Sequence, residues 1–282
     1  MPHPSLFSII WPTVLLTLVM IMVAVASGKF GAWLGARSDQ RPGIVACILA
    51  LAVLLGVVLG LNVRRLYFEF PWSVVLMGQR KWMVMAVILP FLVNLLAGFV
   101  ESEKLRRLLK ILFWICLFRT AVIPFAAPLV SLHELSQIQT MVDEDGVCLQ
   151  RTRYNCGPAA SVTALRMLGL TVEEGPLAIS LGSSAMTGTP DDVLAAGLRR
   201  SFGHEGLTVE HRYLDSIADA SAWPVWIAVI KYSPFVDHFV TVMKVEPEHI
   251  TLGDPARGLR KLTRAEFEKV WRHAAILLRR TP

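Results

Sequence analysis

Charged side chains are scarce in this sequence of 282 residues, because Asp, Glu, Lys and Arg together make up only 18% of it. A typical soluble domain has about a quarter of its residues charged. The apolar share of 54% and the mean hydropathy of +0.52 are correspondingly high. This composition excludes a disordered chain and a purely soluble protein.

Cysteine is also scarce, with four residues and no CxxC pair, which is too few for a disulfide framework. Neither a GxSxG nucleophile elbow nor a GxxxxGK phosphate loop is present. His133-Glu134 begins like the zinc motif HExxH, but Gln137 stands where the second histidine is required. We therefore expect no catalytic metal and no cofactor.

The basic surplus lies entirely in the first half of the chain. Residues 1–130 hold 12 Lys/Arg and 4 Asp/Glu, whereas residues 131–282 hold 16 Lys/Arg and 18 Asp/Glu. Positive charge that is confined to the apolar half is typical of membrane loops and does not indicate a nucleic-acid surface. We expect the lipid bilayer as a partner and no nucleic acid.

Four apolar runs have the length of a membrane span, which needs about 20 residues. They are residues 7–26, 43–61, 82–100 and 111–130. Only the fourth run is charged, at Arg119, which we interpret as snorkelling or pairing inside the bundle; a residue on a substrate path is the alternative. No Lys or Arg precedes the first run, so we expect a retained helix instead of a signal peptide. A membrane domain is predicted at residues 1–130.

The basic residues of the loops predict the orientation of this domain. Loops 27–42, 62–81 and 101–110 carry three, four and four Lys/Arg, respectively. Placing the first and third loops in the cytoplasm gives the larger number of basic residues inside, so both termini are expected outside. The sequence thus predicts a multi-pass protein of a cell membrane whose C-terminal domain is extracytoplasmic.

The second half has the composition of a folded soluble domain. We expect a linker at residues 131–145 and a domain at residues 146–282, which is long enough for one hydrophobic core. Capping and turn residues predict helices at residues 156–168 and after Thr189, and β-branched runs predict strands at 225–230, 238–245 and 250–252. Helices followed by strands indicate an α+β domain.

Four residues of this domain form a pattern that suits nucleophilic catalysis. Cys156 follows a capping Asn155, so it lies on a first helical turn, where free N–H groups stabilise a thiolate; a buried or incidental cysteine is the alternative. His238 opens an apolar strand and can act as the base. Asp254 ends the paired strand and can orient the imidazole. The amide of Gln150 and the N–H of Cys156 can form an oxyanion hole.

Segments 150–160 (QRTRYNCGPAA), 237–240 (DHFV) and 253–258 (GDPARG) resemble the peptidase family C39. Its members are papain-like cysteine peptidases, best known as the leader-cleaving domains of bacteriocin exporters. The resemblance covers residues 146–282 and implies that Cys156 is the nucleophile, His238 the general base and acid, Asp254 its orienting partner and Gln150 the oxyanion donor. The exporters' substrates are leader peptides cut after Gly-Gly or Gly-Ala.

The sequence departs from the exporters because the domain follows the spans and no nucleotide-binding motif is present. A transporter partner would therefore be a separate protein. The predicted fold is an α-helical transmembrane bundle followed by an α+β papain-like cysteine peptidase domain. The predicted function is that of a membrane-anchored cysteine endopeptidase that cleaves peptides or proproteins, including those with Gly-Gly leaders, near the membrane.

Two other functions remain open from the residues alone. The first is a papain-like cell-wall amidase or transglutaminase-type acyl transferase, and the second is a non-catalytic C39-like module that binds peptides. In an oxidising compartment, Cys148 either pairs with Cys156 and blocks catalysis or packs in the core.

Overall fold

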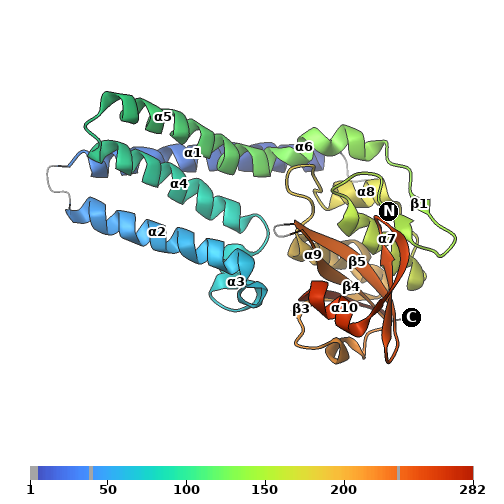
Figure 1. The fold of residues 1–282 in the computed structure, drawn as a ribbon. Helices are drawn as coiled ribbons and strands as arrows, with labels where there is room; N and C mark the ends of the chain where they lie inside the picture. Colours follow the sequence, from blue (N-terminus) through green and yellow to red (C-terminus); the bar gives the residue numbers. More distant parts are fainter. Residues whose placement is uncertain (1–5, 38–40, 234–235, 282) are drawn as a thin grey trace. The chain divides into compact units, whose positions relative to one another are not determined.

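The computed structural model describes residues 6–37, 41–233 and 236–281 (Figure 1). It divides into two compact units, of which the first ends at Leu129 and the second begins at Val130. The outer bounds that the sequence predicts for the two domains, at residues 1 and 282, lie outside the described residues.

The N-terminal unit is helical. Its elements are α1 (Leu6–Gly35), α2 (Arg41–Asn62), η1 (Arg64–Phe68), α3 (Trp72–Leu76), α4 (Arg80–Phe99), α5 (Glu103–Leu117), the π-helical η2 (Phe118–Val122) and the start of α6 (Ile123–Ser136). Four stretches are long and apolar enough to cross a membrane: Ile10–Gly35, Arg41–Gly60, Arg80–Phe99 and Glu103–Ser136. The prediction of four long apolar helices is therefore confirmed.

The helices are longer than the uncharged runs from which they were predicted. The first continues past Lys29 to Gly35, and the fourth begins at Glu103 and reaches Ser136, inside the stretch expected to be a linker. A charge-free run underestimates a span because Lys and Arg near helix ends extend their charged groups toward the interface.

Small residues allow α1 and α4 to pack closely. A Cβ atom added to Gly31 would lie 2.3 Å from the carbonyl oxygen of Phe91, and one added to Gly98 would lie 2.5 Å from the backbone of Gly35. Close backbone approach of this kind is typical of helix pairs in membranes. The guanidinium of Arg119 lies 5.6 Å from the ring centre of Trp82, a cation–π contact within this unit.

The C-terminal unit is an α+β domain. It contains β1 (Met141–Val142), β2 (Cys148–Leu149), α7 (Cys156–Met167), α8 (Glu174–Ser180), α9 (Asp191–Phe202), η3 (Gly203–Glu205), β3 (Leu207–Tyr213), η4 (Ile217–Ala220), β4 (Val225–Ser233), β5 (Val236–Val245), β6 (His249–Asp254), β7 (Gly258–Thr263), α10 (Arg264–Val270) and β8 (Trp271–Arg280). An antiparallel sheet of six strands has the order β3-β8-β4-β5-β6-β7.

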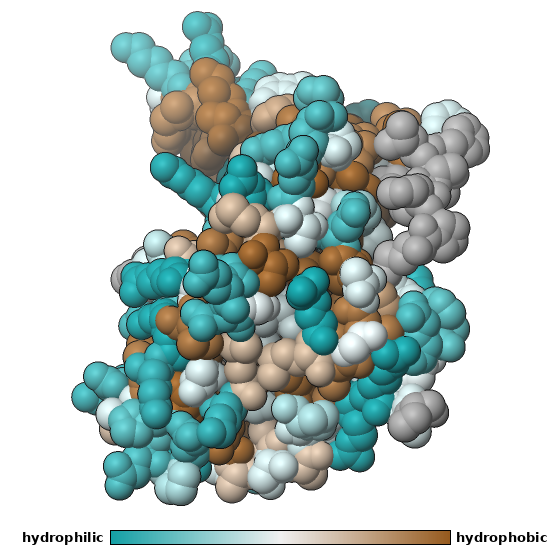
Figure 2. Space-filling view, turned by 90° about the vertical axis from the view of Figure 1, so that its right-hand side faces the viewer, coloured by the Kyte–Doolittle hydropathy of each residue, from teal (hydrophilic) through white to brown (hydrophobic). Residues whose placement is uncertain are grey.

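Both faces of this sheet are covered. On one face, Phe267 of α10 packs against the rings of Trp226 and Trp271. On the other face lies α7, where the Thr241 hydroxyl of β5 donates a 2.7 Å hydrogen bond to the carbonyl of Ala160 (Figure 1). The surface of this unit that faces the viewer in Figure 2 mixes hydrophilic with hydrophobic side chains. This mixture is typical of a domain that is in contact with water.

The local predictions for this domain agree closely with its elements. The helix expected at residues 156–168 is α7, and it ends before Gly169, whose positive φ of 72° suits glycine. The expected strands lie within β4, β5 and β6. Asn155 occupies the N-cap position, but its side chain does not cap the helix, because its amide donates to Glu174 at 3.3 Å.

Candidate active site

The register of β5 and β6 brings His238 and Asp254 to the same face of the sheet. Val242 of β5 is paired with Leu252 of β6, and paired residues share a face. Counting in steps of two from this pair leads to Asp254 on one strand and to His238 on the other. The hairpin therefore places an imidazole and a carboxylate side by side although they are 16 residues apart.

His238 and Asp254 form a buried, hydrogen-bonded pair. Nε2 of His238 lies 2.8 Å from Oδ1 of Asp254, and the two residues are 6% and 2% exposed. Asp254 also accepts from the backbone N–H of Ala256 at 2.9 Å and from Nη1 of Arg260 at 3.0 Å. Three donors thus satisfy the carboxylate, and they fix the orientation of the imidazole.

Cys156 is the first residue of α7 and is partly exposed. Its side chain interacts with the imidazole of His238 and helps to raise its pKa, and because Nε2 of that ring is held by Asp254, Nδ1 is the nitrogen left for the sulfur. The first N–H groups of a helix have no partner within it, so the backbone N–H of Cys156 is a donor beside its own sulfur. The structure therefore brings Cys156, His238 and Asp254 together.

The partners of His238 reverse the effect of its burial on its pKa. Burial alone would lower this pKa, but the hydrogen bond to Asp254 and the hydrogen bond and charge interaction with Cys156 raise it to about 9. Burial would raise the pKa of Asp254, but the hydrogen bonds from His238, Ala256 and Arg260 hold it below its ordinary value. At neutral pH the pair is an imidazolium beside a carboxylate.

We expect this pair to make the C-terminal unit less stable at alkaline pH. The pKa of His238 is about 9 when folded and 6.5 ordinarily, so its stabilisation is complete below pH 6.5 and is lost as the pH rises through 9. The loss amounts to about 3 kcal/mol of unfolding free energy at most. Urea unfolding of the full chain in detergent, followed by tryptophan fluorescence, measures it. If wild type and His238→Ala show the same dependence from pH 6 to 10, the expectation is wrong.

The side chain of Gln150 forms its hydrogen bond outside the group of Cys156, His238 and Asp254. Its backbone N–H donates to the carbonyl of Pro255 at 2.9 Å, so the residue lies beside the segment that follows Asp254. Its side-chain Nε2, however, donates to the carbonyl of Thr152 at 2.9 Å. An amide nitrogen carries two hydrogens, so one remains for an oxyanion. The role of Gln150 as an oxyanion donor therefore stays a prediction.

Three residues near the pair were not predicted from the sequence. Arg260 donates to Asp254, and the ring of Tyr232 lies 5.6 Å from that of His238. Glu174, which is fully buried, accepts from the N–H of Arg151 at 3.2 Å and from the amide of Asn155, so it holds the loop before Cys156 from within the domain. Burial raises the pKa of Glu174, and these two hydrogen bonds oppose the effect.

Cys148 has the properties of a core residue. It is a free, fully buried thiol, and burial together with the charge of Glu174 raises its pKa to about 12. The thiolate of Cys148 is therefore negligible at neutral pH, in contrast to what a nucleophile requires. Cys156 is also a free thiol in this structure, so the two are not joined.

A second His–Asp pair lies in the same domain. Nε2 of His211 is 3.1 Å from Oδ2 of Asp191, and both side chains are buried. No group of three or more His, Cys, Asp or Glu in the described part of the chain is arranged to hold a metal ion. The interaction of Cys156 with His238 makes the His238 pair the candidate for thiol catalysis.

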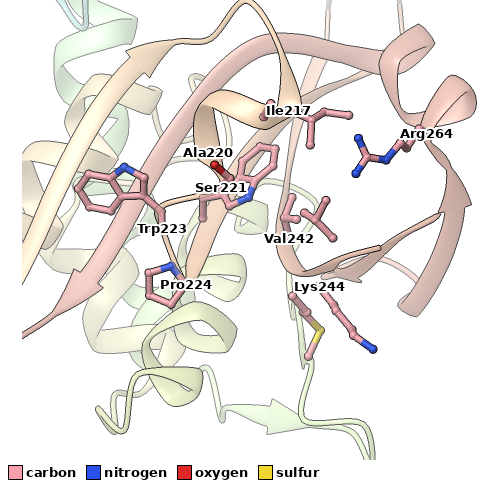
Figure 3. A pocket seen from close by; sticks show the side chains of 12 residues that line it. Ile217, Ala220, Ser221, Trp223, Pro224, Val242, Lys244 and Arg264 are labelled. Carbon is pink, nitrogen blue, oxygen red and sulfur yellow. The ribbon is translucent and has the colours of Figure 1, made fainter. Parts of the chain in front are cut away.

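A cleft of about 510 Å³ lies apart from these residues (Figure 3). Trp223, Pro224 and Val242 contribute to its wall, and Lys244 and Arg264 are its charged side chains. Both charged groups are engaged, because Lys244 pairs with Glu246 at 2.8 Å and Nε of Arg264 donates to the carbonyl of Glu246. This cleft contains none of the predicted site residues.

Curated relatives match the second half of the chain. An uncharacterized protein of Methanothermobacter marburgensis is 27% identical over 147 residues, which cover 52% of this chain and 97% of the relative. An uncharacterized protein of Methanothermobacter thermautotrophicus is 25% identical over 147 residues, which again cover 52% of this chain and 97% of the relative.

Solved structures that are similar to this half are peptidase domains. The peptidase domain of Streptococcus ComA, a bi-functional ABC transporter of a quorum-sensing pathway, has a TM-score of 0.42 and 15% identity, covering 51% of this chain and all of that domain. A double-glycine-motif protease of an AMS/PCAT transporter, solved with its leader peptide, has a TM-score of 0.40 and 16% identity. The match covers 52% of this chain and 96% of that protease.

The sequence profile of the Peptidase C39 family matches residues 145–282. This match begins one residue from the start predicted for the C-terminal domain and includes Gln150, Cys156, His238 and Asp254. The C-terminal half of the chain, and this half only, is thus a domain of the peptidase C39 family.

Proposed function

We propose that the protein is a membrane-anchored cysteine endopeptidase whose C-terminal domain cleaves peptides or proproteins close to the bilayer. The observation that supports this proposal most is the buried hydrogen bond between Asp254 and His238, together with the interaction of His238 with Cys156 at the N-terminus of α7. A nucleophile, a base and a group that orients the base are the three parts that thiol catalysis needs.

Each residue has a defined step in the proposed reaction. His238 takes the proton of Cys156, and the sulfur attacks the scissile carbonyl carbon. The N–H of Cys156 and the amide of Gln150 stabilise the oxyanion. His238 then gives its proton to the leaving amine as the C–N bond breaks, which leaves a thioester on Cys156. Water, deprotonated by His238, hydrolyses the thioester and restores the thiol.

The proposed substrates are peptides, including leader peptides with a Gly-Gly or Gly-Ala pair before the cleaved bond. The two similar domains belong to transporters, ComA and an AMS/PCAT transporter, and the second was solved with its leader peptide, which agrees with a peptide substrate and with a separate transporter as partner. The long apolar helices of residues 6–136 would hold the domain at the membrane.

Cleavage of synthetic peptides tests this function. The purified full chain in detergent is incubated with peptides that contain Gly-Gly or Gly-Ala, with control peptides in which valine replaces both residues, and with muropeptides. Mass spectrometry identifies the products. We expect cleavage after Gly-Gly or Gly-Ala. Cleavage of muropeptides alone would instead indicate a cell-wall amidase, and no cleavage of any substrate would support a peptide-binding module.

We further propose that the peptidase domain lies outside the cytoplasm of a bacterial cell, as the basic loops suggest. Two reporter enzymes, one active only inside the cytoplasm and one active only outside it, are each fused after residue 282 to test this location. Activity inside would overturn it and would place the domain on the side where leader peptides are made.

A further inference from the structure

A cleft of about 410 Å³ opens beside the catalytic pair. His238 and Asp254 both contribute to its lining, together with residues of β4, β7 and α10. Cys156 is not part of the lining, so the cleft borders the imidazole on a side other than that of the sulfur. A ligand in this cleft would therefore contact the general base of the proposed reaction directly.

The lining of this cleft is strongly basic. Its cationic side chains are Lys231, Arg257, Arg260 and Lys269. Apart from Asp254, Glu266 is its only acidic residue, and this carboxylate is engaged, because one of its oxygens accepts from the N–H and the hydroxyl of Thr263 at 2.8 Å each. Residues 131–282 hold more acidic than basic residues, so this cluster is not a general feature of the surface.

The cations differ in how much of their charge is already compensated. Arg260 donates to Asp254, and Lys269 lies near Glu266, whose pKa its charge helps to lower. Lys231 and Arg257 are exposed and have no ion-pair partner in the described part of the chain. These two residues are therefore the ones available to an anionic ligand.

The remaining lining is apolar. Ile230, Leu262 and Val270 line the cleft, and Tyr232 stands against the ring of His238. A concave site that combines apolar lining with a few charged groups suits a peptide side chain better than a flat lipid surface. The nitrogen that faces the sulfur also serves the leaving amine, so a cleft on another side of the ring would receive a substrate side chain and not the scissile bond itself.

We infer that this cleft binds an acidic residue of the substrate through Lys231 and Arg257. The inference rests on the proposed peptidase function. An Asp or Glu side chain in this cleft would pair with the two cations, and Arg260 would link the bound carboxylate to Asp254.

Alkylation of Cys156 by iodoacetate and by iodoacetamide tests the cleft with two probes that differ in charge. Both form an S–C bond and release iodide, but only iodoacetate carries a carboxylate. We expect the rate ratio of iodoacetate to iodoacetamide at Cys156, in the full chain in detergent, to fall about fivefold in a double variant, Lys231→Ala with Arg257→Ala. At high salt the ratios of wild type and variant should converge.

A matched control removes two positive charges elsewhere. Arg200→Ala with Lys261→Ala changes the net charge equally, and neither residue lines the cleft. We expect this control to keep the wild-type ratio. If both double variants lower the ratio equally, the effect is one of net charge and the inference is wrong. If Cys156 reacts no faster than Cys148 even with iodoacetamide, the proposed peptidase function itself fails.

Protection experiments separate a peptide from a membrane as the source of the anion. The peptide Ala-Gly-Gly-Asp-Ala-Ala, its Asn counterpart and phosphatidylglycerol in mixed micelles are each added before iodoacetamide. We expect the Asp peptide to slow alkylation of Cys156 more than the Asn peptide, and the double variant Lys231→Ala with Arg257→Ala to remove this difference. Protection by the lipid alone, or equal effects of the two peptides, would overturn the inference.

Discussion

Replacing Cys156 by alanine is expected to reduce peptide cleavage by about 10⁴- to 10⁶-fold, because loss of the nucleophile removes covalent catalysis and leaves only binding and oxyanion stabilisation. The substitution removes a partly exposed sulfur at a helix N-terminus, so the fold should be little affected. Initial rates of cleavage of the Gly-Gly peptides, measured by mass spectrometry with the full chain, give the ratio.

Cys148→Ala is the matched control for this variant. Cys148 is a free thiol in the same domain, but it is fully buried and its pKa is raised to about 12 by burial and by the charge of Glu174. We expect Cys148→Ala to cleave at nearly the wild-type rate with some loss of stability. Equal loss of cleavage in the two cysteine variants would mean that Cys156 is not the nucleophile.

Replacing His238 by alanine is expected to lower the cleavage rate by about 100- to 10,000-fold, which is the usual contribution of a general base and acid. The imidazole lies between the thiol and Asp254, so its loss removes both the acceptor for the thiol proton and the donor for the leaving amine. The rate should fall at every pH from 6 to 9, as measured with the same peptides.

His211→Ala separates catalysis from stability in this comparison. His211 also forms a buried pair with an aspartate, Asp191, at 3.1 Å, so both variants lose a His–Asp contact and both are expected to lower the unfolding free energy. Only His238→Ala should lower the cleavage rate by about 100- to 10,000-fold in the fraction of protein that is folded. If His211→Ala is equally inactive while folded, the assignment of the base is wrong.

The pairing of His238 with Asp254 and the helical start at Cys156 could be predicted because each depends on local rules. A capping residue and an alanine-rich stretch predicted the helix that starts at Cys156. Strand periodicity and a short hairpin predicted that His238 and Asp254 share a face. The contact across the hairpin, 2.8 Å between Nε2 and Oδ1, agrees with that argument.

Arg260 could have been predicted by the same reasoning but was missed. Asp254 pairs with Gly258 across the β6–β7 hairpin, and Arg260 lies two residues beyond Gly258. Arg260 therefore lies on the same face of the sheet as Asp254. The prediction for this segment extended only to the strand before the turn. The basic cleft was missed for the same reason, because its lining comes from β4, β7 and α10 together.

The surroundings of Gln150 and Asn155 could not be predicted from the sequence. Asn155 occupies its expected N-cap position, yet its amide donates to Glu174, a residue 19 positions away on another helix. Nε2 of Gln150 donates to the carbonyl of Thr152 within an irregular loop. Such bonds depend on how α8 packs beneath the loop, which no local pattern specifies.

The reactivity of Cys156 at neutral pH tests the central claim, that His238 activates this thiol, most directly. Iodoacetamide is added to the full chain in detergent at pH 7, and mass spectrometry gives the separate rates at Cys156 and Cys148. We predict that Cys156 reacts at least about tenfold faster than Cys148 and that His238→Ala removes most of this advantage. Equal, slow reaction of both cysteines, unchanged by His238→Ala, would contradict the account.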